Sequence, residues 1–324
     1  MRRFVHFSAT SVEEAVSLLR RYGKQAAIIA GGTDLLGKMK YEILSRYPEA
    51  IVDIKGMPDL DFIAEEGGML RIGDLTRLED IAAHDIVKTR YQALAEAARR
   101  TASPHIREMG TIAGNICQDI RCWYYRNPHN RFPCLRKGGG RCYAIEGDNR
   151  YHSIFGGSVE EGCYAVHPSD TAPALIALDA EIETSKRKIK ADEFFQVGVA
   201  KTTVLDDDEI VTAIRCPRPL DNTKSAFAKF AIRRTIDFPI VNCAARITLS
   251  KGKVAQTRLC LNAVSVKPYR ALKAEEAIIG KAIDEDHAEA AATAVVADAR
   301  PLQHNGYMVP IAKAMVKRSI LACR

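Results

Sequence analysis

The stretch from Cys117 to Cys163 carries five of the nine cysteines of the chain and shows neither the period of a helix nor the alternation of a strand. Arginine, asparagine, glycine and proline replace the periodic apolar residues found elsewhere. Connections in compact domains usually span about 4 to 6 residues. A segment of this length is therefore expected to have a function or to be stabilised by a cross-link or a bound group. We therefore expect an ordinary fold into which a cysteine-bearing segment is inserted.

The cellular setting limits what these cysteines can do. The residues after Met1 lack the uninterrupted apolar stretch of a signal peptide, and no later run reaches the ~18 apolar residues of a membrane span. We expect a cytoplasmic protein whose cysteines act as thiols, metal ligands or redox groups and not as disulfides. The net charge of +7 arises from Lys and Arg mixed with acidic residues, a pattern that does not favour nucleic-acid binding.

The residues before this segment predict alternating helices and strands. The run SVEEAVSLLRRYG begins at Ser11 and closes at Gly23 with the capping pattern of an amphipathic helix. Ala26–Ile29 predicts a short strand, IVDIKG and LRIGDLT predict two more, and residues 78–101 predict one or two helices. With 324 residues, 47% of them apolar, the chain is long enough for two or three domains.

The residues after the segment predict a second, different arrangement. TAPALIALDAEIE predicts a helix followed by a strand, VTAIRCP predicts a strand, and Pro217 and Pro219 indicate a domain boundary. Beyond it, SAFAKFAIR, VNCAARITL and TRLCLNAV predict strands, and AEEAIIG and HAEAAATAVVADA predict helices. This order is typical of a small antiparallel sheet backed by helices.

Two loops of small residues are candidates for binding a phosphate-bearing cofactor. Ala30-Gly31-Gly32-Thr33-Asp34 follows a predicted strand directly, and Gly110-Thr111-Ile112-Ala113-Gly114-Asn115 forms the second loop. Residues without side chains let backbone N–H groups approach a phosphate closely, and the hydroxyl and amide side chains add donors. Neither loop has the spacing of a dinucleotide-fold or NTPase phosphate loop, and a Gly-Gly pair alone is more often a tight turn.

These loops, together with ASPHIREMGTIAGN, SDTAPALIALDA and DFPIVNCAA, strongly resemble the FAD-binding (medium) subunits of the xanthine dehydrogenase, or molybdenum hydroxylase, family. The resemblance covers essentially the whole chain. It implies an α+β / α/β fold, in which a two-part FAD-binding domain of the vanillyl-alcohol-oxidase-like (PCMH) type precedes a small antiparallel sheet with helices. The implied divisions are residues 1–55 and 56–219 for the FAD-binding parts, with the cysteine-rich insertion at about 118–164, and 220–324 for a CO-dehydrogenase-flavoprotein-like domain.

The same resemblance implies a set of flavin-binding residues. Ala113 departs from the family, which often has a second glycine there, and its methyl group narrows the available φ angles. The first loop would line the pyrophosphate, the second would complete the flavin site, and two later residues would contact the flavin. The implied residues are Ile29, Ala30, Gly31, Gly32, Thr33, Asp34, Leu35, Thr111, Gly114, Asn115, Gln118, Asp170 and Lys229.

Four of the clustered cysteines could hold an inorganic centre. Cys122, Cys134, Cys142 and Cys163 are separated by eleven, seven and twenty residues, which matches neither the knuckles of zinc sites nor the compact ferredoxin spacing. Their chemistry alone leaves an iron–sulfur cluster, zinc and uncoordinated thiols open. The segment is similar to the insertion in the beta subunit of 4-hydroxybenzoyl-CoA reductase, and that resemblance implies that the four cysteines ligate a [4Fe–4S] cluster.

The remaining cysteines and histidines are expected to be structural. Cys117 lies in the second glycine loop, and a small buried cysteine is the commoner interpretation there, although it could replace Cys163 as the fourth ligand. Four more cysteines lie within strand or helix patterns, and isolated histidines usually do not bind metal. These residues are Cys216, Cys243, Cys260, Cys323, His105, His129 and His167.

The resemblance implies a relay in which FAD and a [4Fe–4S] cluster pass electrons between an external carrier, ferredoxin-like or NAD, and partner subunits. The partners would be a large molybdenum-pterin subunit and a small [2Fe–2S] subunit, in a dimer of heterotrimers. The substrate, an aromatic acyl-CoA or a heterocycle, would react on a partner, and no catalytic residue is nominated here. Alternatives are an NAD-linked FAD subunit of a xanthine, aldehyde or CO dehydrogenase without the cluster, and a non-redox zinc-binding scaffold.

Overall fold

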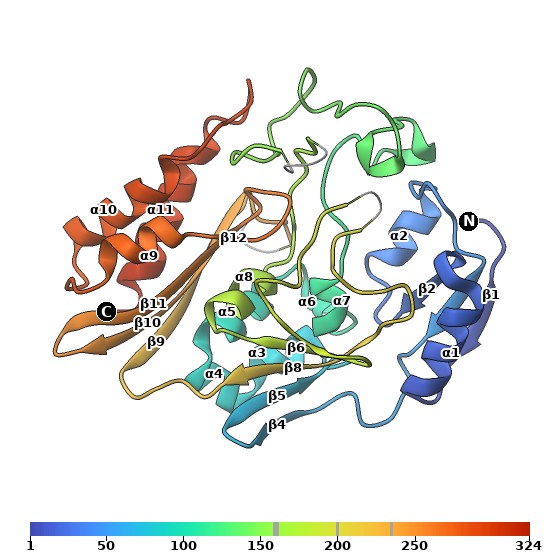
Figure 1. The fold of residues 1–324 in the computed structure, drawn as a ribbon, viewed down its shortest axis with the longest axis horizontal. Coiled ribbons are helices and arrows are strands. Elements are labelled where there is room, and N and C mark those ends of the chain that lie inside the picture. Colours follow the sequence, from blue (N-terminus) through green and yellow to red (C-terminus); the bar gives the residue numbers. More distant parts are fainter. Residues whose placement is uncertain (158–161, 199–200, 234–235) are drawn as a thin grey trace.

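The computed structural model describes residues 1–157, 162–198, 201–233 and 236–324, which form three β-sheets with helices between and around them (Figure 1). The first sheet is parallel, in the order β1-β3-β2. Its strands are β1 (Val5–Ser8), β2 (Ala26–Ile29) and β3 (Ala50–Asp53). Helix α1 (Val12–Tyr22) begins as predicted, because the Ser11 hydroxyl accepts a hydrogen bond from the Glu14 N–H at 3.2 Å.

The second sheet is antiparallel, in the order β4-β5-β8-β6-β7. Its strands are β4 (Ile63–Glu66), β5 (Met69–Gly73), β6 (Glu181–Thr184), β7 (Lys188–Lys190) and β8 (Val211–Pro217). β5 pairs with β8 although the cysteine-rich segment lies between them in the chain. The cysteine-rich segment is therefore an insertion between strands of one sheet and not a linker between two separately folding units.

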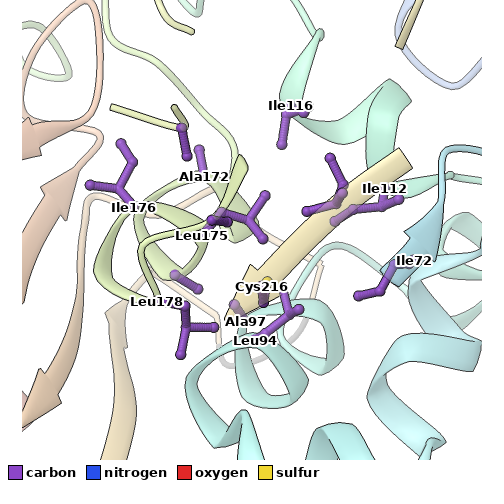
Figure 2. Close-up of a cluster of buried hydrophobic side chains, with 14 of the residues drawn as sticks. Ile72, Leu94, Ala97, Ile112, Ile116, Ala172, Leu175, Ile176, Leu178 and Cys216 are labelled. Atoms are coloured by element: carbon purple, nitrogen blue, oxygen red, sulfur yellow. The ribbon is translucent and has the colours of Figure 1, made fainter. Parts of the chain in front are cut away.

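Helices pack on this second sheet and form the largest hydrophobic core, part of which appears in Figure 2. They are α3 (Leu78–Ala83), α4 (Asp85–Arg90), α5 (Gln92–Arg99), α6 (Pro104–Arg107), α7 (Ile112–Ile116) and α8 (Thr171–Ala177). The one or two helices predicted over residues 78–101 are three, because His84 and Tyr91 leave helical backbone angles. Ile72, Leu94 and Leu175 are fully buried in this core.

The third sheet is antiparallel, in the order β12-β11-β10-β9, and helices cover it. Its elements are β9 (Thr223–Phe230), β10 (Val241–Ser250), β11 (Lys253–Asn262), β12 (Tyr269–Arg270), α9 (Leu272–Ile278), α10 (Glu285–Val296) and α11 (Met308–Leu321). Helices α9 and α11 contact this sheet. Helices α5 and α8, which belong to the core on the second sheet, also contact it. The structure confirms the predicted antiparallel sheet backed by helices. Helix α11 was not predicted from the sequence. No helix among the described residues is long and apolar enough to cross a membrane.

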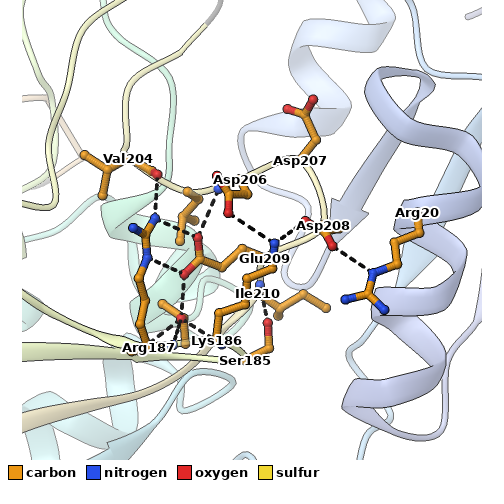
Figure 3. A network of polar contacts seen from close by, with 12 residues as sticks. Arg20, Ser185, Lys186, Arg187, Val204, Asp206, Asp207, Asp208, Glu209 and Ile210 are labelled. Atoms are coloured by element: carbon orange, nitrogen blue, oxygen red, sulfur yellow. Dashed lines mark hydrogen bonds and ion pairs between the residues drawn. The ribbon is translucent and has the colours of Figure 1, made fainter.

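A polar network fixes the first sheet against the second (Figure 3). Arg20 on α1 bonds Asp208 at 2.8 Å, and Lys186, between β6 and β7, bonds Asp206 at 3.1 Å. Glu209, which is only 2% exposed, accepts hydrogen bonds from Arg187 at 3.0 Å and from Thr184 at 2.7 Å. A buried carboxylate with several donors strongly restrains its neighbours. The network therefore joins α1, which packs on the first sheet, to the β6–β7 turn and to the residues before β8.

The core between α5 and the second sheet should dominate stability. Replacing Leu94 by alanine removes buried methyl groups and leaves a cavity, so the free energy of unfolding should fall by about 2–5 kcal/mol. The matched change Leu272→Ala, at a side chain that is 53% exposed, should alter it by less than about 1 kcal/mol. Urea unfolding followed by circular dichroism measures both, and equal losses would contradict the assignment of this core.

Candidate functional site

The first glycine loop connects β2 to α2 (Leu35–Lys40) and touches the second loop directly. Gly32 has a φ of +70°, which favours glycine. A Cβ atom on Gly31 would lie 2.0 Å from the carbonyl oxygen of Met109, just before the second loop. Only glycine permits this approach, so the two loops predicted from the sequence form one continuous surface.

The second loop is held by its own side chains at the start of α7. The Thr111 hydroxyl accepts a hydrogen bond from the Gly114 N–H at 3.1 Å, capping the helix. The Asn115 side-chain oxygen accepts hydrogen bonds from Ser169 at 2.5 Å and Thr171 at 2.7 Å. Gln118 donates to the Asn115 backbone oxygen at 2.8 Å. The loop is thereby fixed to the start of α8.

Asp170 and Lys229 form a buried ion pair at the third sheet. The Lys229 ammonium lies 2.6 Å from the Asp170 carboxylate, and Asn242 donates to the other carboxylate oxygen at 2.7 Å. Lys229 also donates to the backbone oxygen of Arg100 at 2.8 Å. Burial raises the pKa of Asp170, and Lys229 acts against that rise. Asp170 therefore joins α8 to β9 and β10 at the wall of the site.

Strand β2, the helices and loops beside the second sheet, and the segment between β9 and β10 line one cavity of about 520 Å³. Of the thirteen flavin-binding residues predicted above, twelve line it, and Lys229 lies behind Asp170. The volume falls within the range typical of cofactor sites, roughly 300–1,000 Å³. The sequence interpretation missed other lining residues, among them Lys38, Thr101, Ala102, Arg121, Pro168, Ile236, Asp237 and Phe238. The structure thus brings the predicted set together around one space large enough for a nucleotide cofactor.

Asp34 connects this cavity to the cysteine-rich segment. Its carboxylate lies 2.8 Å from Arg126 and 3.1 Å from Arg121, and it accepts a hydrogen bond from the Asp119 N–H at 3.0 Å. Burial alone would raise the pKa of Asp34, but Arg126, Lys38 and Arg121 lower it well below its usual value. The carboxylate stays ionised and anchors the segment beside the first glycine loop.

The four predicted cysteine ligands line one small cavity. Cys122, Cys134, Cys142 and Cys163 surround a space of about 10 Å³, roughly enough for one water molecule. Two single-turn 3₁₀-helices lie in the same segment, at Pro128–Asn130 and Leu135–Lys137. Within the described ranges, no three His, Cys, Asp or Glu side chains are arranged as a metal site. The cysteines gather around one space as predicted, but in this arrangement they do not form a closed metal site among the described residues.

Buried cationic and imidazole atoms surround this cysteine cavity. The Arg136 Nε, the Lys137 Nζ and the His152 Nδ1 are buried and have no hydrogen-bond partner in the part of the chain that the structure describes. Burial lowers the pKa of Lys137. The other nitrogen of His152 lies 3.3 Å from the Cys122 sulfur. Buried donor atoms without a partner are costly, so this environment suits a group that accepts hydrogen bonds or carries negative charge.

The remaining cysteines, and the three histidines considered from the sequence, lie outside the cysteine cavity. Cys117 lines the large cavity and not the cysteine cavity, and Cys216, Cys243, Cys260 and Cys323 are fully buried, so their prediction as core thiols is confirmed. His105 and His129 are exposed, while His167 is buried with its Nδ1 3.2 Å from the Asn262 amide. Sequence reasoning missed His152, which only the fold places beside Cys122.

A cavity of this size between two glycine loops, with a paired buried carboxylate at its wall, is typical of a protein that binds a phosphate-bearing cofactor. The family profile described as "FAD binding domain in molybdopterin dehydrogenase" matches residues 2–219, and "CO dehydrogenase flavoprotein C-terminal domain" matches residues 225–323. The chain belongs to this family: it is an FAD-binding medium subunit of the molybdenum hydroxylase type. The predicted fold class is thereby confirmed.

Individual relatives agree along the whole chain. The chain is 36% identical to the aldehyde oxidoreductase FAD-binding subunit PaoB of Escherichia coli, over 97% of this chain and 95% of that protein. It is 30% identical to the carbon monoxide dehydrogenase medium chain of Hydrogenophaga pseudoflava, over 99% and 96%. A solved structure of carbon monoxide dehydrogenase from that organism, which lacks the Mo-pyranopterin moiety, superimposes with a TM-score of 0.79 at 29% identity, covering 99% and 97% of the two chains.

The contact between the two glycine loops gives the sharpest test of the FAD site. In Gly31→Ala, the added methyl group would overlap the Met109 carbonyl and separate the loops, so FAD retention should weaken by at least roughly tenfold. Gly37→Ala is a matched control, because a Cβ there meets nothing within 4 Å. The flavin-to-protein absorbance ratio after gel filtration measures both, and full flavin content in Gly31→Ala would contradict the site.

A buried carboxyl lies next to the cavity wall. Asp74 is 1% exposed, its Oδ1 has no hydrogen-bond partner among the described residues, and its charge acts on Cys117. Burial raises the pKa of Asp74 to about 8. Because an unfolded aspartate titrates near ~3.9, the folded state holds the proton across the interval between these values.

The raised pKa predicts the pH dependence of stability. The contribution of Asp74 should be full below about pH 4 and should be lost as pH rises towards about 8, since the folded protein must then carry a buried charge. Asp74→Asn should therefore flatten the decline in the free energy of unfolding between roughly pH 5 and 8. Urea unfolding at several pH values checks this, and parallel pH profiles for both proteins would contradict it.

Proposed function

We propose that this chain is the electron-relay subunit of a molybdenum hydroxylase-type complex, with FAD in the large cavity and a [4Fe–4S] cluster at the four cysteines. The observation that carries this proposal is the meeting of both predicted ligand sets in adjacent cavities, which share the continuous segment from Gln118 to Cys122. A flavin exchanges one or two electrons and a cluster exchanges single electrons, so the pair can link carriers of both kinds.

The residues of the large cavity suit FAD in charge and shape. The backbone around Gly31 and Gly32 is open to a pyrophosphate, and Thr33 and Thr111 add hydroxyl groups at the same wall. Lys38 and Arg121 supply positive charge beside the loops, partly balanced by Asp34. These residues would hold and orient the cofactor.

The surroundings of the cysteine cavity suit an anionic cluster better than four neutral thiols packed against one another. A four-cysteine cluster carries net negative charge, and Arg136 and Lys137 present buried, unsatisfied donor atoms to the same segment. The Arg136 guanidinium also lies 3.5 Å from Asp119, which Lys38 contacts at 3.4 Å. A zinc ion would need the same four thiolates, so metal analysis has to separate these two centres.

The partners proposed are a large molybdenum-pterin subunit and a small [2Fe–2S] subunit, as a dimer of heterotrimers. Family membership and full-length similarity to medium chains support an assembly of this type. Arg131, Arg141 and Arg150 are exposed on the cysteine-rich segment and favour an acidic, ferredoxin-like external carrier. The aromatic acyl-CoA or heterocyclic substrate and the division at residues 55 and 219 remain predictions.

A second function has specific support: an FAD subunit of the aldehyde, xanthine or CO dehydrogenase type without the cluster, passing electrons to NAD. The cysteine cavity holds no closed metal site among the described residues and has room for about one water molecule. Iron and acid-labile sulfide analysis of the anaerobically purified complex, with its EPR spectrum, distinguishes the two functions. Family membership favours either of them over the non-redox zinc-binding scaffold.

The cluster proposal predicts separate loss of the two cofactors. Cys134→Ser should lower iron from roughly four atoms per chain to near zero and leave most FAD in place, because Cys134 lines only the cysteine cavity. Cys117→Ser is the control, since Cys117 lines the flavin cavity, and it should retain the iron. Undiminished iron in Cys134→Ser, or iron loss in Cys117→Ser, would refute the ligand set.

A further inference from the structure

A second cavity, of about 430 Å³, opens beside the flavin cavity and has aromatic and aliphatic walls. Trp123 and Tyr151 pack with ring centroids 5.7 Å apart on one side, and Phe238, Pro239 and Ile240 contribute from the segment before β10. Trp123 and Phe238 are each 50% exposed, and Ile232 is 69% exposed. Such a concentration of exposed large apolar side chains is typical of a binding site and not of ordinary protein surface.

This aromatic cavity is continuous with the flavin cavity. Arg121, Pro168, Asp237 and Phe238 line both spaces. The Arg121 guanidinium lies 4.2 Å from the centroid of the Phe238 ring and is held by Asp34 at 3.1 Å. Its Nε is buried without a hydrogen-bond partner in the described part of the chain. A ligand in the aromatic cavity would therefore meet an oriented guanidinium at the junction.

The composition of the aromatic cavity selects among redox ligands. Its described lining residues include no glycine, serine, threonine, asparagine or lysine, and its two arginines, Arg121 and Arg126, are both bound to Asp34, so few donors remain for a pyrophosphate. Nicotinamide dinucleotides are therefore a poor match. A flat ring could lie against Trp123 and Tyr151, and a carbonyl oxygen could accept a hydrogen bond from Arg121.

We propose that the aromatic cavity binds a quinone as a two-electron acceptor of the flavin subunit. This inference rests on the proposed function, because the flavin must supply the electrons. One quinone takes up two electrons and two protons, all available from the two-electron-reduced flavin, and leaves as the hydroquinone, which regenerates oxidised flavin. Arg121 positions the quinone carbonyl at the junction of the two cavities.

The sole tryptophan of the chain reports on this cavity directly. Trp123 lines it, so menadione added to the FAD-loaded full chain should quench tryptophan fluorescence in a saturable way. Tyr151→Ala should weaken menadione binding by about tenfold, whereas Tyr151→Phe should retain it, because the ring makes the contact. Tyr41→Ala removes an exposed ring outside the cavity and should change nothing.

The possible outcomes separate this inference from the proposed function. Flavin content and its bleaching by a reductant test the flavin relay independently of menadione. Normal flavin with absent, unsaturable or Tyr151-independent quenching would overturn the quinone site and leave the relay intact. Release of FAD by menadione would mean that the cavity belongs to the flavin's own site, and competition by NAD⁺ at lower concentration would indicate a dinucleotide site. Either result also overturns the inference.

Discussion

The buried charge of Asp34 is the interaction on which the arrangement of the site depends. Asp34 ends the first glycine loop, and its carboxylate is surrounded by Arg121 and Arg126 of the cysteine-rich segment and by Lys38 of α2. A buried carboxylate is tolerated only when opposite charges and donors satisfy it. These ion pairs hold the first glycine loop against the inserted segment, so the insertion contributes Arg121 to the wall of the large cavity.

The same interaction decides how close the three cavities lie. The four residues from Asp119 to Cys122 reach all three cavities. Asp119 joins the charge network, and Ile120 lines the cysteine cavity. Arg121 lines the flavin and aromatic cavities, and Cys122 lines the aromatic and cysteine cavities. The backbone of Arg121 is fixed by a β-bridge to Val166. In the proposed relay, a segment held in this way would keep the flavin and the cluster at a constant separation.

The sequence predicted the parts of this arrangement that depend on local pattern. The strand Ala26–Ile29, the capped helix after Ser11 and the buried cysteines of the third sheet follow from apolar periodicity and capping residues. Helix α11 was missed because Pro310 in its first turn looks like a helix breaker, although proline is tolerated there. β1 was missed because its side chains are mostly exposed, and its parallel pairing with β3 is what stabilises it.

The non-local parts of the site could not follow from pattern. Asp34 and Asp119 are 85 residues apart, and Cys122 and His152 are 30 apart, so no periodicity connects them. The two glycine loops and the four cysteines were candidates from residue type and spacing, and resemblance supplied their roles. The structure adds what both omitted: an arginine shared by two cavities and an aromatic wall beside the flavin cavity.

In the proposed relay, the cysteine and aromatic cavities, which share Cys122, would give electrons two exits from the flavin. A one-electron centre and a two-electron acceptor both have to approach the flavin, yet each needs a different environment: buried cations for an anionic cluster, and flat apolar walls for a quinone. Cys122 contributes to both walls, and its neighbour Trp123 lines only the aromatic cavity. In the proposed relay, Cys122 and Trp123 would lie between the path of single electrons to the cluster and the path of electron pairs to the quinone. Both paths would start at the same flavin.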